Sequence, residues 1–153
     1  MKPVAGRGYL ACDFCSTFHF TTPLDQSPDT ITPLGEASEI ACPVCEGMLS
    51  KGALDDGHAL FCENCRGILV DCEHFADVVR RRRADRIGPE SKPLPLEPAE
   101  LRRQILCPLC GSRMEVHPYY GPGNAVIDSC CRCHTVWLDY GEMAGIVTAP
   151  GLR

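Results

Sequence analysis

Cysteines in regularly spaced pairs constrain this chain more than any other feature. The 153 residues include 12 cysteines, and ten of these form C-x-x-C pairs. The pairs are Cys12/Cys15, Cys42/Cys45, Cys62/Cys65, Cys107/Cys110 and Cys130/Cys133. Two cysteines separated by two residues place both sulfurs on one side of a tight turn, called a knuckle below. Two knuckles together supply the four-sulfur shell that Zn²⁺ accepts, although such cysteine counts also occur in disulfide frameworks.

The N-terminal residues and the hydropathy of the chain favour metal over disulfides. Residues 1–8 contain no apolar run typical of a secretory signal. The chain also has no stretch of about 18 apolar residues that could span a membrane. We therefore expect a cytoplasmic protein whose reduced cysteines bind zinc. Iron is an alternative occupant, because iron proteins use similar knuckles.

The last four pairs form an internal duplication. Cys42-Pro43-Val44-Cys45 corresponds to Cys107-Pro108-Leu109-Cys110 at an offset of 65 residues, and the later pairs correspond at an offset of 68. An apolar run ending in aspartate follows each second pair, at 68–71 and 136–139. Such a repeat indicates one structural unit used twice. We expect two zinc sites, made by Cys42, Cys45, Cys62 and Cys65 and by Cys107, Cys110, Cys130 and Cys133.

The spacing predicts a small zinc-stabilised α+β fold with two tandem zinc ribbons. Each ribbon has a short antiparallel hairpin, a third strand and a short helix. The expected hairpin strands are 48–54 with 58–61, and 114–117 with 125–128. The third strands should cover 68–71 and 136–139, and the helices 73–86 and 141–147.

The sequence divides into four expected segments. Residues 1–39 form an N-terminal extension with one knuckle, of which 18–39 reads as an extended stretch or one hairpin. Residues 40–87 form the first ribbon and its helix. Residues 88–104 are a Pro-rich linker followed by a short helix that opens at Pro98. Residues 105–153 form the second ribbon. We expect Cys110→Ser to unfold the second ribbon and to leave the first folded.

The second copy carries the motif C-x-x-C-x-G-x-W-L-D-x-G-E almost completely, through Cys133, Trp137, Leu138, Asp139, Gly141 and Glu142. In this motif the chain resembles the transcription-factor-IIB-type zinc finger family, a bacterial zinc-ribbon group. The resemblance covers residues 42–79 and 107–147. Thr135 replaces the usual glycine, and the first copy has Leu69 and His74 in place of the tryptophan and glutamate. The resemblance implies a zinc-ribbon fold and, by analogy, a link to transcription.

The N-terminal pair Cys12/Cys15 has no obvious second knuckle. It could form a third zinc site completed by His19, Cys72 or His74, which would raise the content from two zinc ions per chain to three. It could instead pair with Cys42/Cys45, or carry free thiols. Cys72 and Cys131 have no counterpart in the other copy and read as spare thiols.

The charge pattern leaves two interpretations open. A net charge of -5 argues against nucleic-acid binding over the whole surface. A basic strip nevertheless contains Arg80, Arg81, Arg82, Arg83 and Arg86, which would suit RNA, DNA or an acidic protein face. Alternatively, these arginines occupy a solvated helix end and stabilise its carbonyl groups. Tyr119 and Tyr120 similarly suit either base stacking or a buried contact between modules or protomers.

The sequence shows no catalytic constellation. His58, His117 and His134 lack an evident nucleophile partner, and a four-cysteine zinc shell leaves no open coordination position. Asp71 and Asp139 are expected to cap the helices that follow them. We therefore expect a non-enzymatic zinc protein that acts as a protein-interaction or assembly module, with a protein partner or a second copy. The alternative is a nucleic-acid-associated, transcription-related factor that uses Arg80–Arg86. No small-molecule substrate is indicated.

Overall fold

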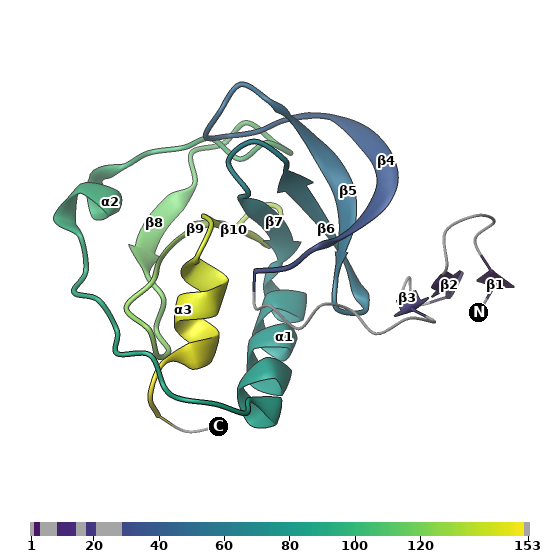
Figure 1. The fold of residues 1–153 in the computed structure, drawn as a ribbon. Helices are drawn as coiled ribbons and strands as arrows, with labels where there is room; N and C mark the ends of the chain where they lie inside the picture. The colour runs from purple at the N-terminus through teal and green to yellow at the C-terminus, as the bar shows by residue number, and fades with distance from the viewer. Residues whose placement is uncertain (1, 4–8, 15–17, 21–28, 152–153) are drawn as a thin grey trace.

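The computed structural model describes residues 2–3, 9–14, 18–20 and 29–151, which form two antiparallel sheets and three helices (Figure 1). The small sheet has the order β1-β2-β3, and the large sheet has the order β4-β5-β6-β7-β10-β9-β8. The strands of the small sheet are β1 (Lys2–Pro3), β2 (Tyr9–Ala11) and β3 (Phe18–Phe20). Those of the large sheet are β4 (Thr32–Ala41), β5 (Met48–Leu54), β6 (Gly57–Cys62), β7 (Ile68–Asp71), β8 (Glu115–Pro118), β9 (Val126–Cys130) and β10 (Thr135–Leu138). The helices are α1 (Cys72–Asp85), α2 (Pro98–Arg102) and α3 (Glu142–Thr148).

The strands and helices of both ribbons lie close to their predicted positions. One difference is β4, which begins at Thr32 inside the segment assigned to the N-terminal extension. It pairs with β5 through an irregular register, so residues 32–39 belong to the sheet of the first ribbon. Residues 21–28 of the expected extended stretch lie outside the described residues.

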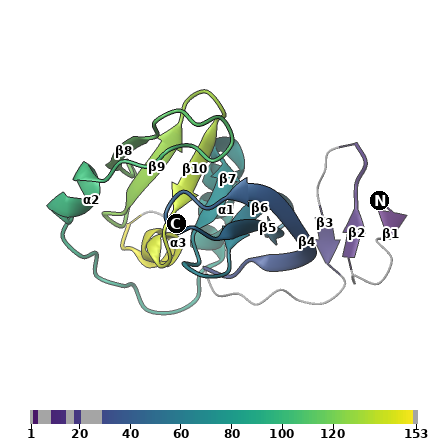
Figure 2. The same cartoon turned by 90° about the horizontal axis from the view of Figure 1, so that it is seen from above.

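The two ribbons share one continuous sheet because β7 pairs antiparallel with β10. In this pairing Leu69 lies opposite Trp137, and these two residues occupy the same position in the two copies. Val70 opposite Val136 and Ile68 opposite Leu138 are likewise exchanged by the duplication. The pairing therefore has a pseudo-two-fold axis at the Leu69–Trp137 pair. Figure 2 shows β4–β7 and β8–β10 side by side along the sheet.

Helices α1 and α3 pack against each other beside the central strands β7 and β10 (Figure 1). The residues that they bury are related by the duplication: Phe75, Val78 and Val79 in α1, and Met143, Ile146 and Val147 in α3. They form one core cluster with Ile68, Val70, Val136 and Leu138. Burial of these side chains from both copies gives the molecule a common apolar core.

A second core cluster contains the alternate residues of the central strands. Leu69 and Trp137 lie in it with Leu49, Met114 and the first cysteine of each of the last four pairs. Trp137 is fully buried. Its ring contacts Gly67 so closely that a Cβ on this glycine would lie 2.1 Å from the Trp137 Cζ2 atom. The packing of Trp137 therefore requires that residue 67 of the first ribbon has no side chain.

Within the described part of the chain, no helix combines the length and apolar character needed to cross a bilayer.

Candidate metal centres

Each expected zinc site brings its four cysteine sulfurs together. The Sγ atoms of Cys42, Cys45, Cys62 and Cys65 all lie within 4.8 Å of one another, and so do those of Cys107, Cys110, Cys130 and Cys133. The Sγ–Sγ distance is 3.6 Å for Cys42–Cys65, 3.3 Å for Cys45–Cys62 and 3.6 Å for Cys110–Cys130. Four sulfurs at about 2.3 Å from a tetrahedral ion would be separated by roughly 3.8 Å. Both groups thus fit a zinc ion with four sulfur ligands.

Backbone hydrogen bonds close three of the four knuckles. The amide of Cys42 donates to the Gly47 carbonyl at 2.7 Å, and the amides of Cys62 and Cys107 make the same five-residue closure at 2.9 and 2.7 Å. The amides of Val44 and Cys45 point at the Cys42 Sγ atom, both at 3.4 Å. Amide donors directed at a sulfur stabilise its thiolate form, which is the form that binds metal, although burial still raises the pKa of Cys42.

The four thiols of each group differ in pKa, and without a bound cation they do not all deprotonate together. The Gly47 amide lowers the pKa of Cys45 to about 7, whereas burial raises the pKa of Cys65 to about 12. In the second site Ser112 lowers the pKa of Cys110 to about 6, and the hydrogen bond with Cys110 raises the pKa of Cys133 to about 12. One thiolate forms readily, and its negative charge then opposes the deprotonation of the neighbouring thiols. A bound divalent cation offsets this repulsion between thiolates, because its positive charge stabilises all four of them.

The expected third site is only partly within the described residues, because Cys15 lies outside them. Cys12 follows β2, and His19 is an exposed residue of β3. Two of the proposed additional ligands have other roles. The His74 Nε2 atom lies 2.7 Å from the Leu54 carbonyl oxygen, and Cys72 packs against the core at the start of α1. The third zinc site therefore stays a prediction.

The arginines of the basic strip make contacts within the protein itself. Arg80 pairs with Asp77 at 2.9 Å, Arg81 with Asp56 at 2.7 Å, and Arg82 with Asp55 at 2.5 Å.

Arg83 is 5% exposed and donates from Nη1 to the carbonyls of Ile146 and Ala149 at 2.6 and 3.0 Å. Arg86 donates to the Thr148 carbonyl at 2.7 Å. Two of the five arginines, Arg83 and Arg86, stabilise the carbonyl end of a helix, but that helix is α3 and not their own.

We expect Arg83→Ala to lower the free energy of unfolding by about 2 kcal/mol, because it leaves buried carbonyl groups of α3 without a donor. Arg80→Ala on the same helix removes only an exposed pair and should change it by less than about 0.5 kcal/mol. Urea unfolding of both variants measures the difference. Equal effects would show that Arg83 does not anchor α3.

The two aspartates that follow the third strands have different roles. Asp71 caps α1 as predicted, accepting from the amides of Glu73 and His74 at 2.9 and 3.1 Å. The prediction for Asp139 was wrong. Its Oδ1 atom accepts from the Trp137 indole at 3.0 Å, and its Oδ2 atom accepts from Arg103 at 2.5 Å.

The amides at the start of α3 are satisfied by Asp29 instead. Its Oδ1 atom accepts from Gly141 and Ala144 at 3.2 and 3.3 Å. Sequence reasoning missed this residue because it lies more than a hundred positions away from the helix.

A group of carboxylates lies beside Trp137 and is held by one arginine. Arg103, at the end of α2, donates to the fully buried Asp128 and to Asp139, each at 2.5 Å. Glu142 accepts from the Asp139 amide at 2.7 Å, and burial raises its pKa to about 8. Burial also raises the pKa of Asp128. The linker is thus fixed to the second ribbon by an ion-pair network that the sequence did not predict.

The raised pKa of Glu142 has a consequence for stability. Because its pKa rises from 4.5 to about 8, the folded state keeps a proton that the unfolded state releases, and stability falls as pH rises through this window. Between about pH 6.5 and 8.0 the loss should approach roughly 2 kcal/mol. Glu142→Gln keeps the acceptor and should remove this dependence. Urea unfolding of both proteins at the two pH values tests this, and parallel losses would contradict it.

The aromatic residues of the second hairpin separate into two environments. Tyr119 packs edge-on against Phe75 of α1 at 5.5 Å between ring centroids, which makes it a contact between the two copies. Tyr120 is 88% exposed and stacks on His117 at 5.1 Å. His117 also places Nε2 at 3.0 Å from the Ser129 Oγ atom, a pairing that sequence reasoning missed. The His117–Ser129 pair is a contact between the neighbouring strands β8 and β9.

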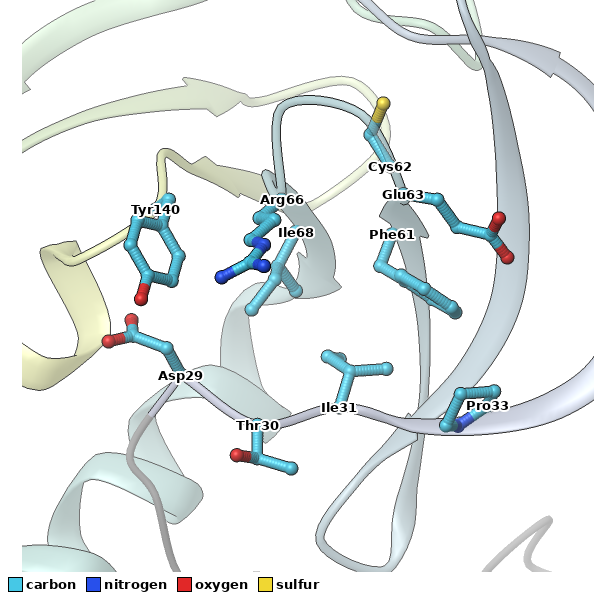
Figure 3. A pocket seen from close by; sticks show the side chains of 10 residues that line it. All are labelled: Asp29, Thr30, Ile31, Pro33, Phe61, Cys62, Glu63, Arg66, Ile68 and Tyr140. Atoms are coloured by element: carbon cyan, nitrogen blue, oxygen red, sulfur yellow. The ribbon is translucent and has the colours of Figure 1, made fainter.

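One hollow of about 470 Å³ lies between the first ribbon and the start of α3 (Figure 3). Ile31, Phe61 and Ile68 form its apolar part. The Arg66 guanidinium lies 5.3 Å from the centre of the Tyr140 ring, which offers it a cation–π contact. Asp29 and Glu63 line the same hollow, so its charge is mixed and does not select an anionic ligand.

A smaller hollow of about 270 Å³ has a more uniform, apolar lining that includes Leu60, Leu69 and Leu109. It lies where the second ribbon's C-P-x-C knuckle approaches the sheet of the first ribbon.

Comparisons with protein-family models, with curated proteins and with solved structures found no significant match to this chain. The two four-cysteine groups are therefore the firmest guide to its chemistry.

Proposed function

We propose that this chain is a non-catalytic zinc protein whose fused ribbons act as a protein-interaction module. The observation that carries the proposal is the pair of exposed apolar side chains at matching positions of the two C-P-x-C knuckles. Val44 is 43% exposed and Leu109 is 46% exposed. Met48, four residues after Val44, and Leu106, three residues before Leu109, are 51% and 59% exposed. Apolar side chains on a rigid, metal-fixed turn suit contact with another protein surface.

The metal supports this role through structure and not through reaction chemistry. Four cysteine ligands at each site leave no coordination position for a substrate. The resemblance to the transcription-factor-IIB-type zinc finger family supports a ribbon with zinc as the occupant. Native mass spectrometry of reduced protein should therefore show two zinc ions per chain, or three if the Cys12/Cys15 knuckle also binds one. Iron in place of zinc would contradict the metal assignment.

A photo-crosslinking residue at position 109 tests the interaction role. We expect a discrete cross-linked protein species, either a partner or a second copy, that disappears when a chelator removes the metal. The same residue at position 80, on the exposed side of α1, serves as the control. Identical cross-linking at both positions, or none at position 109, would contradict the proposal.

The nucleic-acid alternative has weaker support, because Arg81, Arg82 and Arg83 already contact groups of the protein. If it were correct, affinity for generic RNA or DNA would fall steeply with salt, and neutralising Arg80 to Arg83 would weaken it. We expect no binding at low salt. Measurable binding that these substitutions abolish would favour the alternative.

A further inference from the structure

The pseudo-symmetry of the sheet allows its two halves to be compared residue by residue. One row of directly paired residues crosses six strands of the large sheet, in the order β5-β6-β7-β10-β9-β8. In the first half the row runs Lys51, Leu60, Leu69, and in the second half Trp137, Asp128, Val116. Each residue of the first half has its counterpart in the second, so the surfaces above the two half-rows are equivalent sites.

The site in the second half is filled by the chain itself. The Trp137 indole lies over Gly67 and donates to Asp139. Arg103, from the segment that precedes the ribbon, reaches Asp128 and Asp139 at 2.5 Å each. A chain segment outside the ribbon thus places one side chain over the row and completes the surface.

The equivalent site in the first half is open. It is the hollow of about 270 Å³ lined by Leu60, Leu69, Asp71, Leu109 and Thr135 among others. Leu69 is smaller than the matching tryptophan. Ser38 occupies the position that matches Arg103, and its hydroxyl donates to the Leu49 carbonyl at 2.6 Å within the sheet. No residue of the first half takes the place of Arg103 in the part of the chain that the structure describes.

We propose that this hollow docks an extended segment of a partner protein, which presents a leucine-like side chain over Leu60 and Leu69. This inference rests on the proposed interaction role and names its site. Leu60 stands where Asp128 holds the arginine, so a guanidinium here would find only one of the two carboxylates. That carboxylate, Asp71, already caps α1, and the Lys51 ammonium group lines the same hollow, so an arginine would lose its water without full compensation. An aliphatic side chain would instead cover Leu60 and the half-exposed Leu109. A protein segment is the expected occupant because a protein segment fills the equivalent site.

The test uses zinc-loaded full-length protein with labelled leucine methyl groups, titrated with capped tripeptides and followed by NMR. Acetyl-Ala-Leu-Ala-amide should give saturable shifts at Leu60, Leu69 and Leu109, with a dissociation constant on the order of 10 mM. Acetyl-Ala-Arg-Ala-amide is the matched control and should give none. Leu60→Asp and Leu109→Ser should each weaken the leucine peptide at least about fivefold. The zinc content and amide spectrum of each variant report whether it has folded.

Two results would overturn the proposal. Absent shifts at these three leucines in the folded wild-type protein would show that the hollow takes no aliphatic side chain. Equally tight binding of 3-methylbutanol, which has the side chain but no peptide backbone, would make the hollow a pocket for small apolar molecules. In either case the cross-linking at position 109 would still decide the interaction role separately.

Discussion

Replacing Cys110 with serine should unfold both halves of this protein and release both metal ions. A structural zinc site contributes on the order of 10 kcal/mol, comparable to the whole stability of a small domain. The sequence by itself suggested that only the second ribbon would be lost. The pairing of β7 with β10 and the packing of α1 on α3 change that expectation, since the first ribbon would expose its share of the core.

Native mass spectrometry and circular dichroism measure this outcome together, as zinc ions per chain and as the remaining fold. Cys131→Ser is the matched control, because Cys131 lies between two ligands of the same site but is itself an exposed non-ligand. It should keep both ions and the full fold. A Cys110→Ser protein that retains one zinc ion and a folded first half would show that the ribbons are independent.

A single methyl group added at Gly67 should be among the most damaging substitutions outside the metal sites. The new Cβ would lie 2.1 Å from the Trp137 Cζ2 atom, and Trp137 is fully buried with its indole bonded to Asp139. The ring cannot move aside without disturbing the core and this bond. We expect Gly67→Ala to lower the free energy of unfolding by about 3 kcal/mol.

Gly145→Ala gives the control for Gly67→Ala. Gly145 lies inside α3, and a Cβ there meets no atom within 4 Å. Alanine at this position should stabilise the protein by roughly 0.5 kcal/mol or more. The double variant Gly67→Ala with Trp137→Leu should recover part of the loss relative to the two single changes, because leucine is the residue that the first copy uses. Additive losses in urea unfolding would show that the two residues do not compete for space.

Much of the local structure was predictable from spacing and turn chemistry. The hairpins, third strands and helices followed from the positions of cysteine, glycine and apolar residues, all within one neighbourhood of the chain. The grouping of the eight cysteines was predictable for the same reason, since each C-x-x-C knuckle is a local structure and the duplication identifies which knuckles belong together. Asp71 could be assigned as a cap because its targets are two and three residues away.

The contacts made across the chain were not predictable in this way. Asp139 has the same local context as Asp71, yet it binds Trp137 and Arg103 while Asp29 caps the helix that follows. The arginines of α1 looked like a surface strip, and the fold uses Arg83 and Arg86 on the carbonyls of α3.

The sequence by itself determined the local units of this protein: four knuckles, two hairpins with their third strands, and two four-cysteine groups that could each hold a metal ion. These depend on backbone geometry and on sulfur atoms a few residues apart. Only the tertiary structure decided that the ribbons join along β7 and β10, with Trp137 over Gly67 in one half and an open apolar hollow in the other. The physical reason is that edge-strand pairing and core packing depend on the shapes of distant surfaces, which no local spacing records.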